Sequence, residues 1–301
     1  VGSSIGETST GARFVAVANA SVCASSEDGI TWTNRTMPSS DNWWRVCGVY
    51  GKFVTFARNS NKAAWSADGI TWTAATLPTS RNWSDISHDG TYFCITCYDA
   101  AVCAISTNGV SWVEYAMPNS QSRIQGNAGV FVSSNGMGSG TVTCWSLDHG
   151  RSWTVGATIS GASLGLGNMC TDKERIIMAG ELGSCYFTTS HAVSWTAGGT
   201  AAGLCYGLAF GNETFVLSEA IGPPANHFYT SADGVVWTDR GAIPGGLSGV
   251  GYLAFGNPGG IERFVYVNGS GTDALYGSDA INWTATTISN QTWNDAAWGG
   301  Q

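Results

Sequence analysis

The segment Ser26-Glu27-Asp28-Gly29-Ile30-Thr31-Trp32 decides the fold, because its pattern returns six more times along the chain. Two copies keep nearly every feature, Ser66 to Trp72 and Ser106 to Trp112, the second with Asn108 in place of Asp. The tryptophans that end the seven copies stand at positions 32, 72, 112, 153, 195, 237 and 283. A fixed period of about 40 residues predicts one structure built by repetition.

The other four copies are less regular. Ser146 to Trp153 has one extra residue, and Thr189 to Trp195 has His191-Ala192 where Asp-Gly is expected. Ser231 to Trp237 restores the pattern. Gly277 to Trp283 is the last copy and has Ala280 where the glycine of Asp-Gly is expected. The repeat thus runs through most of the 301 residues.

Each unit has the pattern of four strands. In the second unit we expect strands over 43–50, 52–58, 62–66 and 70–75, because apolar residues alternate there between turn residues. The Asp68-Gly69 pair between two β-rich runs is typical of a hairpin. Four antiparallel strands repeated radially at this period predict the blade of a β-propeller.

The two ends of the chain predict how the ring closes. Residues 292–300 match the first strand of a unit, whereas residues 11–17 match the second strand. We therefore expect an all-β fold, a single seven-bladed β-propeller of four-stranded antiparallel blades over residues 11–301. Pairing of the C-terminal strand with the N-terminal strands would close the ring and remove its open edges. Residues 1–10, rich in Gly and Ser, are expected to be a flexible linker from an upstream part of a longer protein.

Composition excludes several classes of protein. Only 11% of the residues are charged and the net charge is −8, with three Lys and ten dispersed Arg, so no basic stripe is available for nucleic acid. No apolar run is long enough for a membrane helix, and we expect no membrane insertion. Most of the nine cysteines lie in apolar strand-like runs, and Cys94-x-x-Cys97 would point its thiols to opposite faces of a strand. We expect free thiols, no metal and no cofactor.

The repeated segment resembles the Asp box, S-x-D-x-G-x-T-W, of sialidases and related β-propellers. Ser146 to Trp153 fits that pattern best, with Ser152 in place of Thr. In that family the box is a turn between the third and fourth strands, far from the active site. The resemblance and the chemistry of a short carboxylate or amide in a tight turn imply a structural role for one residue per box. These residues are Asp28, Asp68, Asn108, Asp148, Asp233 and Asp279.

Binding residues are expected on the opposite face, where loops can vary. Trp43, Trp83 and Trp293 occupy the same place in three units that closure makes neighbours, and three rings there would suit stacking on sugars. A packing role beneath the crossing between units is the alternative. The polar or aromatic residues expected beside them are Trp44, Arg45, Arg81 and Asp85, with Asn42 and Asn82. The candidate loops are 59–61, 98–100, 135–140, 181–183, 219–226 and 268–273.

The whole repeat, with N-W, a short strand, G-x-F-V and S-x-D-G-I-T-W-T, resembles propeller repeats in tail-fibre and receptor-binding proteins of tailed bacteriophages. The resemblance implies a lectin-like receptor-binding domain that recognises a bacterial surface glycan or another host receptor. Such a domain would be made in the bacterial cytoplasm, belong to the extracellular virion tail, and attach through its N-terminus to an upstream tail-fibre or baseplate protein.

Two other functions stay open, a glycan hydrolase or depolymerase of the sialidase-like type and a structural propeller that docks other virion subunits. We expect no enzyme, because Arg13-Phe14-Val15 is not the F-R-I-P motif of sialidases and the four histidines are isolated.

Overall fold

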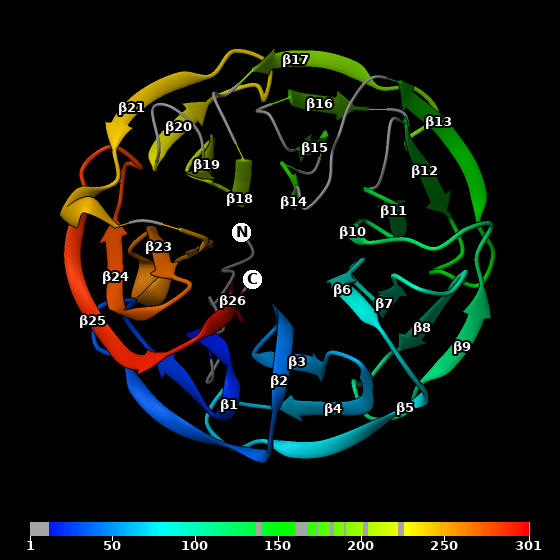
Figure 1. Cartoon of the computed structure of the whole chain (residues 1–301), viewed down its shortest axis with the longest axis horizontal. Helices are drawn as coiled ribbons and strands as arrows, with labels where there is room; N and C mark the ends of the chain where they lie inside the picture. Colours follow the sequence, from blue (N-terminus) through cyan, green and yellow to red (C-terminus); the bar gives the residue numbers. More distant parts are fainter. Residues whose placement is uncertain are drawn as a thin grey trace, which may run out of the picture.

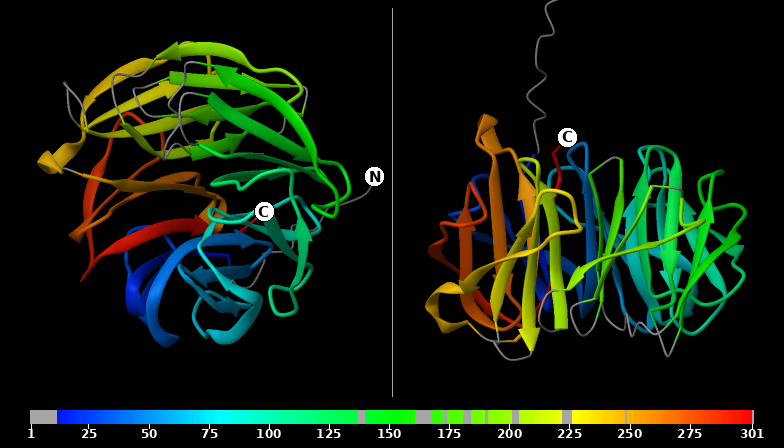
Figure 2. Two further views of the ribbon diagram at one scale, coloured as in Figure 1. Left: turned by 45° about the vertical axis from the view of Figure 1, so that its right-hand side comes forward. Right: turned by 90° about the horizontal axis from the view of Figure 1, so that it is seen from above.

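The strands form a ring around a central axis (Figure 1). The computed structural model describes residues 12–136, 140–160, 168–172, 174–180, 184–189, 191–200, 204–221, 226–247 and 249–300. The regular structure of these residues is extended apart from two short 3-10 helices, η2 (Pro244–Gly246) and η3 (Pro258–Gly260). Seen from the side, the ring is a disc whose strands run from one face towards the other (Figure 2). The all-β propeller fold is therefore confirmed, whereas the expected linker 1–10 lies outside the described residues.

Hydrogen bonds join the strands into six antiparallel sheets, one of six strands and five of four. The six-stranded sheet has the order β26-β1-β2-β3-β4-β5. Its strands are β26 (Trp293–Trp298), β1 (Phe14–Ser26), β2 (Thr33–Val49), β3 (Lys52–Ala57), β4 (Ser60–Ser66) and β5 (Thr73–Arg81).

The four-stranded sheets keep the order of the chain. The first two consist of β6 (Trp83–His88), β7 (Phe93–Cys97), β8 (Val102–Ser106) and β9 (Val113–Ala116), then β10 (Arg123–Asn127), β11 (Val130–Ser134), β12 (Gly140–Ser146) and β13 (Thr154–Ser160). The next two consist of β14 (Asn168–Thr171), β15 (Ile176–Ala179), β16 (Ser184–Thr188) and β17 (Thr196–Thr200), then β18 (Leu204–Gly211), β19 (Thr214–Ile221), β20 (His227–Ser231) and β21 (Thr238–Ala242). The last consists of β22 (Gly251–Gly256), β23 (Arg263–Asn268), β24 (Gly271–Gly277) and β25 (Thr284–Gln291).

The prediction of seven four-stranded blades is wrong. The first and second repeats share one sheet, because β2 pairs with β1 as far as Asn42 and with β3 from Trp43 onward. The chain crosses between these two repeats without leaving the extended conformation, whereas Asn82 interrupts the next crossing, between β5 and β6. Six sheets therefore take the place of the seven that the repeats predict.

The ring closes through the expected pairing of its two ends. β26 is antiparallel to β1, with Phe14 opposite Trp298 and Ala18 opposite Trp293. The approach between the closing strand and β2 is also close, since a Cβ atom added to Gly48 would lie 2.5 Å from the carbonyl oxygen of Trp298. The C-terminal strand is therefore fixed on both sides near the axis of the ring (Figure 1).

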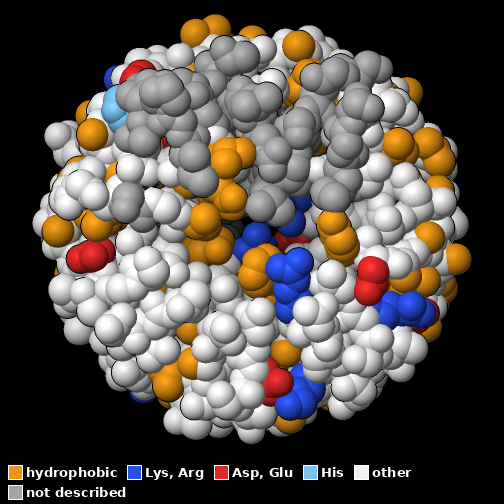
Figure 3. Space-filling view, viewed as in Figure 1, with side chains coloured by type: hydrophobic (Ala, Val, Ile, Leu, Met, Phe, Trp, Pro, Cys, Tyr) orange, Lys and Arg blue, Asp and Glu red, His pale blue; other side chains and the backbone are white. Residues whose placement is uncertain are grey.

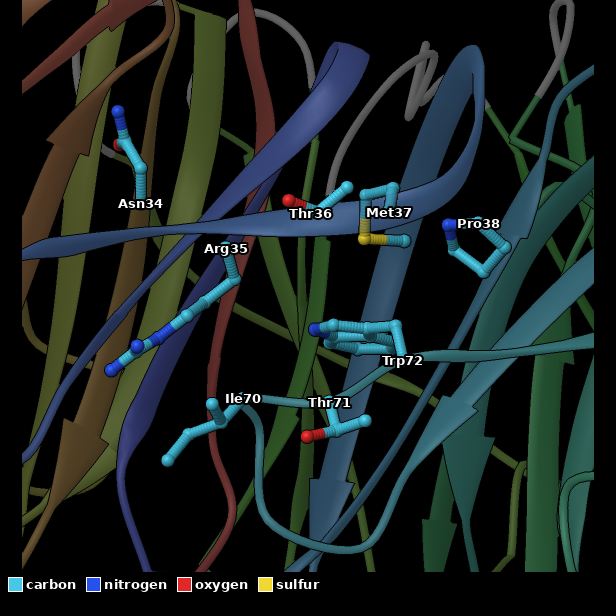
Figure 4. Close-up of a pocket in the computed structure, with 8 residues that line it drawn as sticks. All are labelled: Asn34, Arg35, Thr36, Met37, Pro38, Ile70, Thr71 and Trp72. Atoms are coloured by element: carbon cyan, nitrogen blue, oxygen red, sulfur yellow. The ribbon is translucent and has the colours of Figure 1, made fainter.

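The core is divided into hydrophobic clusters between neighbouring repeats. Each of the seven tryptophans that end the repeated segments lies in or against a different cluster. Trp72, for example, shares a cluster with Val15 of the first repeat and Phe53 of the second, so this cluster lies between the two halves of the six-stranded sheet. Figure 4 shows its indole below Met37, beside β2. These tryptophans fill the gaps between repeats.

An Asp, or Asn in the third repeat, holds the turn before six of these seven tryptophans. Oδ1 of Asp68 accepts hydrogen bonds from the backbone N–H groups of Ile70 (2.8 Å) and Thr71 (2.9 Å) and from the hydroxyl of Ser66 (2.9 Å). Gly69 has φ +69°, and a Cβ atom there would lie 2.9 Å from a methyl group of Val15 in the preceding repeat. The glycine is therefore required both by the turn and by the close approach of the neighbouring repeat.

Five other repeats have the same type of turn. Asn108 accepts bonds from the backbone of Val110 and Ser111 with its amide oxygen. Asp28, Asp148, Asp233 and Asp279 accept equivalent backbone bonds. Where glycine is missing, Ala192 and Ala280 adopt positive φ angles of 63° and 58°. The six residues assigned to this role by sequence therefore all lie inside turns.

The hydrogen-bond register separates two faces of the disc. We call the face that carries the Asp68 turn the box face. Trp43 lies at the other end of its strand pair, opposite Ala57, and we call that face the pocket face. No helix of the described residues has the length and apolar character needed to cross a membrane.

Candidate ligand-binding site

The three tryptophans expected to stack on sugars are buried. The exposed fractions of Trp43, Trp83 and Trp293 are 1%, 0% and 1%. The indole N–H groups of Trp43 and Trp83 donate to the carbonyl oxygens of Ser39 and Thr79, both over 3.2 Å. Their rings have no face open to a ligand, so they belong to the core and the packing alternative describes them.

Arg81 also lies away from the pocket described below. Its guanidinium forms a two-pronged ion pair with Glu114, with Nη2 to Oε1 at 2.9 Å and Nε to Oε2 at 3.1 Å. Asn82, the next residue, contacts a side chain of the pocket: its side-chain oxygen accepts a hydrogen bond from Nε of Arg58 over 3.1 Å.

Trp44 and Arg45, in contrast, line a cavity of about 370 Å³ on the pocket face. Its other lining residues are Arg58, Ser84, Tyr98, Ser122, Arg123, Tyr206, Val250 and Tyr252. The space-filling view has Lys or Arg and hydrophobic side chains around a hollow at the centre of the ring (Figure 3). Four aromatic and three guanidinium side chains therefore meet in one recess.

β-Bulges in the innermost strands orient several of these side chains. The register shifts at Trp44 in β2, at Ser84 in β6 and at Tyr206 in β18. Such bulges bend a strand and redirect the extra side chain, and they are frequent next to binding sites. Trp44 is fixed further by its indole N–H, which donates to the carbonyl oxygen of Ser84 over 3.1 Å.

Equivalent backbone hydrogen bonds position Arg58 in the second repeat and Tyr98 in the third. The N–H of Arg58 donates to the carbonyl oxygen of Asn42, and the N–H of Tyr98 donates to that of Asn82, each over 3.0 Å. Each residue directly follows the second strand of its repeat. The repeat thereby puts a cationic and an aromatic side chain at equivalent points of the pocket rim.

A buried cluster of four charges lies at the base of the pocket. Nε of Arg45 is 3.8 Å from Oδ1 of Asp85, and its Nη1 donates to the carbonyl oxygen of Asn294 over 2.6 Å. Asp295 and Arg123 influence the same guanidinium electrostatically. The charged residues occupy matching positions in consecutive repeats, and their signs alternate in the order Asp295, Arg45, Asp85 and Arg123.

Both carboxyl groups of this cluster accept hydrogen bonds from backbone N–H groups. The two oxygens of Asp85 accept from the N–H groups of Ile86 and Ile124, each over 3.0 Å, and Asp295 accepts from Val46 over 3.0 Å. Asp85, expected to fix a ligand, therefore links neighbouring repeats instead.

Burial changes the protonation equilibria of the cluster. Burial raises the pKa of Asp85, and it raises the pKa of Asp295 to about 6 despite the neighbouring Arg45. Burial and the adjacent Arg45 lower the pKa of Arg123 to about 10. The negative charge of the two carboxyl groups therefore balances the positive charge of the guanidinium groups only in part.

Two other recesses have less suitable linings. One of about 520 Å³ lies at the outer rim between β2 and the Trp72 turn, where Figure 4 shows Asn34, Thr36, Pro38 and Thr71 around it. Another of about 680 Å³ lies on the box face and includes Tyr50. Among the described residues no three His, Cys, Asp or Glu side chains are grouped so as to hold a metal ion. The pocket with Trp44 has the densest combination of aromatic and charged groups.

Of the expected residues and loops, Trp44, Arg45 and Tyr98 of loop 98–100 line this pocket, and sequence reasoning did not single out its other lining residues Arg58, Arg123, Tyr206 and Tyr252. Aligning the first strands of the repeats would have revealed the alternating charges at the second residue after each buried Trp position. The loop 181–183 and parts of loops 135–140 and 219–226 lie outside the described residues.

Comparison with known proteins supports the fold alone. No profile of a known protein family matches the chain, and no curated protein sequence matches it. Solved structures do resemble it. Virginiamycin B lyase from Staphylococcus aureus is 14% identical with a TM-score of 0.69, over 83% of this chain and 85% of that chain. YCF48 bound to a D1 peptide is 13% identical with a TM-score of 0.60, over 83% and 82%.

A nidogen/laminin complex is 8% identical with a TM-score of 0.58, over 96% and 98%. These β-propellers include a lyase, a peptide-bound protein and a component of a protein complex. Because these proteins differ in function, their shared fold does not indicate the function of this chain, which has to be inferred from its own pocket.

Proposed function

We propose that the chain is a non-catalytic, lectin-like domain that binds a bacterial surface glycan in the pocket lined by Trp44 and Tyr98. The observation that carries this proposal is the lining of the pocket. Aromatic rings there provide faces for sugar rings, while guanidinium and hydroxyl groups provide donors for sugar oxygens.

The wider context of the proposal comes from the repeat. Its similarity to repeats of tailed-bacteriophage receptor-binding proteins supports a place in the virion tail, with an upstream tail-fibre or baseplate protein as the partner of the N-terminal side. Display in several copies would let weak individual sites add up to firm attachment.

A binding role agrees better with the pocket than a hydrolytic one. Glycoside hydrolysis needs two carboxyl groups on either side of the scissile bond. The described lining residues include no Asp or Glu, and the carboxyl oxygens of Asp85 beneath them accept backbone hydrogen bonds. The sugar would therefore meet cationic and aromatic groups rather than an acid and a base.

Two exposed tyrosines on opposite faces provide a matched test. The exposed fraction of Tyr98, in the pocket, is 36%, and that of Tyr50, on the box face, is 59%. The multivalently displayed domain is incubated with whole bacteria and with their extracted surface polysaccharides. Tyr98→Ala should weaken binding by about tenfold, as expected for an aromatic contact worth about 1.4 kcal/mol, whereas Tyr50→Ala should leave it unchanged.

Other results would point elsewhere. Equal binding by both variants would remove the site from this pocket. Shortening of the polysaccharide over time would establish a depolymerase. Stable co-purification with another virion protein, together with no glycan affinity, would establish the docking role.

A further inference from the structure

Positive charge is concentrated in the pocket although the whole chain carries a net charge of −8. Arg45, Arg58 and Arg123 line the cavity, and none of the described residues that line it is acidic. The half-buried Asp85 and Asp295 belong to the cluster beneath it. Among the described residues, the carboxyl groups that act on these guanidinium groups are those of Asp85 and Asp295.

Arg45 interacts with both carboxyl groups of the cluster. It forms the ion pair with Asp85, and Asp295 is the strongest of the electrostatic influences that hold its pKa above the ordinary value against burial. Its side chain is also only 7% exposed. Arg45 is therefore a fixed part of the pocket base and not the group that would meet a ligand first.

Arg58 is the cation best placed for a ligand. It is half-buried, its Nε donates to the neutral amide of Asn82, and its guanidinium carbon lies 4.4 Å from the ring centroid of Trp44. None of the ion pairs among the described residues includes Arg58. The amide and the indole thus orient a guanidinium whose charge has no ionic partner, and this preorganisation favours an anion.

Arg123 adds a second positive group deeper in the recess. Its Nη1 donates to the carbonyl oxygen of Ser122 over 2.8 Å, and it is 4% exposed. With a pKa of about 10 it stays charged at neutral pH, although burial and Arg45 oppose that charge. An anion in the cavity would relieve this repulsion.

We propose that the pocket selects a sugar residue that carries a carboxylate, such as a hexuronic acid, with the carboxylate towards Arg58 and Arg123 and the pyranose ring towards Tyr98. This inference rests on the proposed function, because it names the class of glycan that the same pocket takes. The planar fork of a guanidinium matches the two oxygens of a carboxylate. The cavity of about 370 Å³ lies within the usual range of ligand pockets, about 300–1,000 Å³.

Ligand-observed NMR titration of the folded domain tests the inference with three probes: D-glucuronate, D-glucose and inorganic phosphate. The wild type should bind glucuronate at least tenfold more tightly than glucose, and 0.5 M NaCl should reduce the difference. Arg58→Ala should abolish the preference, and Arg58→Lys should keep part of it, since the charge remains but the fork is lost. Arg81→Ala is the matched control, because its guanidinium is paired with Glu114 away from the cavity.

Each of the other outcomes would overturn a specific part of this inference. Equal affinity for glucuronate and glucose would overturn selection of an anion while leaving glycan binding intact. Phosphate that binds as tightly as glucuronate and displaces it would overturn the carboxylate sugar in favour of a general anion site. No binding of either sugar would overturn the inference, and the cell-binding comparison of Tyr98→Ala with Tyr50→Ala would then decide the proposed function separately.

Discussion

Replacement of Asp68 by alanine tests how the repeated turn stabilises the ring. In the folded chain one carboxyl oxygen accepts three hydrogen bonds, two from the backbone of Ile70 and Thr71 and one from Ser66. Alanine removes all three. Asparagine should keep them, because Asn108 accepts the same set of bonds in the third repeat with its amide oxygen.

The expected cost follows from those bonds. A hydrogen bond contributes about 1 kcal/mol net, and water can replace part of the lost bonding at a half-exposed turn, so Asp68→Ala should lower the free energy of unfolding by about 2 kcal/mol. For a chain of this size that corresponds to a fall in Tm of about 3 °C. Asp68→Asn should cost less than about 1 kcal/mol. Urea unfolding followed by tryptophan fluorescence, with a thermal scan beside it, measures both.

The pH dependence gives a second readout. Although burial alone would raise it, hydrogen bonds from the N–H groups of Thr71 and Ile70 hold the pKa of Asp68 below its ordinary value. The ionised carboxylate therefore stabilises the fold above about pH 4, and this contribution is lost as the pH falls through the folded-state pKa. Asp68→Asn should lose less stability than the wild type on acidification. A variant Asp68→Asn as unstable as Asp68→Ala, or an Asp68→Ala variant equal to the wild type, would refute this reasoning.

Three further predictions concern the core and the closure of the ring. Trp83→Ala should lower the free energy of unfolding by about 3–5 kcal/mol in urea titration, since the indole is fully buried; a near-neutral effect would contradict its assignment to the core. Gly48→Ala should force its Cβ atom against the carbonyl oxygen of Trp298, cost about 1–3 kcal/mol, and accelerate hydrogen exchange in β26, and unchanged exchange there would argue against the close approach. Asp295→Asn should gain stability relative to the wild type as the pH rises from 4 to 8. Burial raises the pKa of Asp295 to about 6, so its protonated form stabilises the fold at low pH and that contribution is lost above pH 6; a constant difference across this range would contradict the assignment.

The repeat made the architecture predictable, because period and turn chemistry act locally. The Ser-x-Asp-Gly turns and their tryptophans form where they were expected, and β26 pairs with β1 as the incomplete first and last units predicted. The number of separate sheets depends on whether one residue at a crossing keeps extended geometry. Asn42 does so and Asn82 does not, although both precede a Trp in the same local sequence, so the pattern could not distinguish them.

The residues of the candidate pocket were harder to predict, because burial depends on contacts between repeats. Trp43 and Trp44 are adjacent in the sequence, yet one is in the core and the other lines the pocket, since a bulge at Trp44 shifts the register. Asp85 looked like a polar ligand-binding residue, but the backbone of the following repeat uses its carboxylate. Arg58 follows an ordinary strand, and the pairing of β3 with β2, with its register shift at Trp44, brings its guanidinium over the Trp44 ring.

The most direct test of a glycan site in this pocket is hydroxyl-radical footprinting of the domain with and without the polysaccharide of a bacterium that it binds. Oxidation of aromatic side chains reports how far a ligand covers them. Bound polysaccharide should protect Trp44 and Tyr98 and leave Tyr50, on the box face, as reactive as before. Protection of Tyr50 with unchanged oxidation of Trp44 and Tyr98 would contradict a glycan site in this pocket.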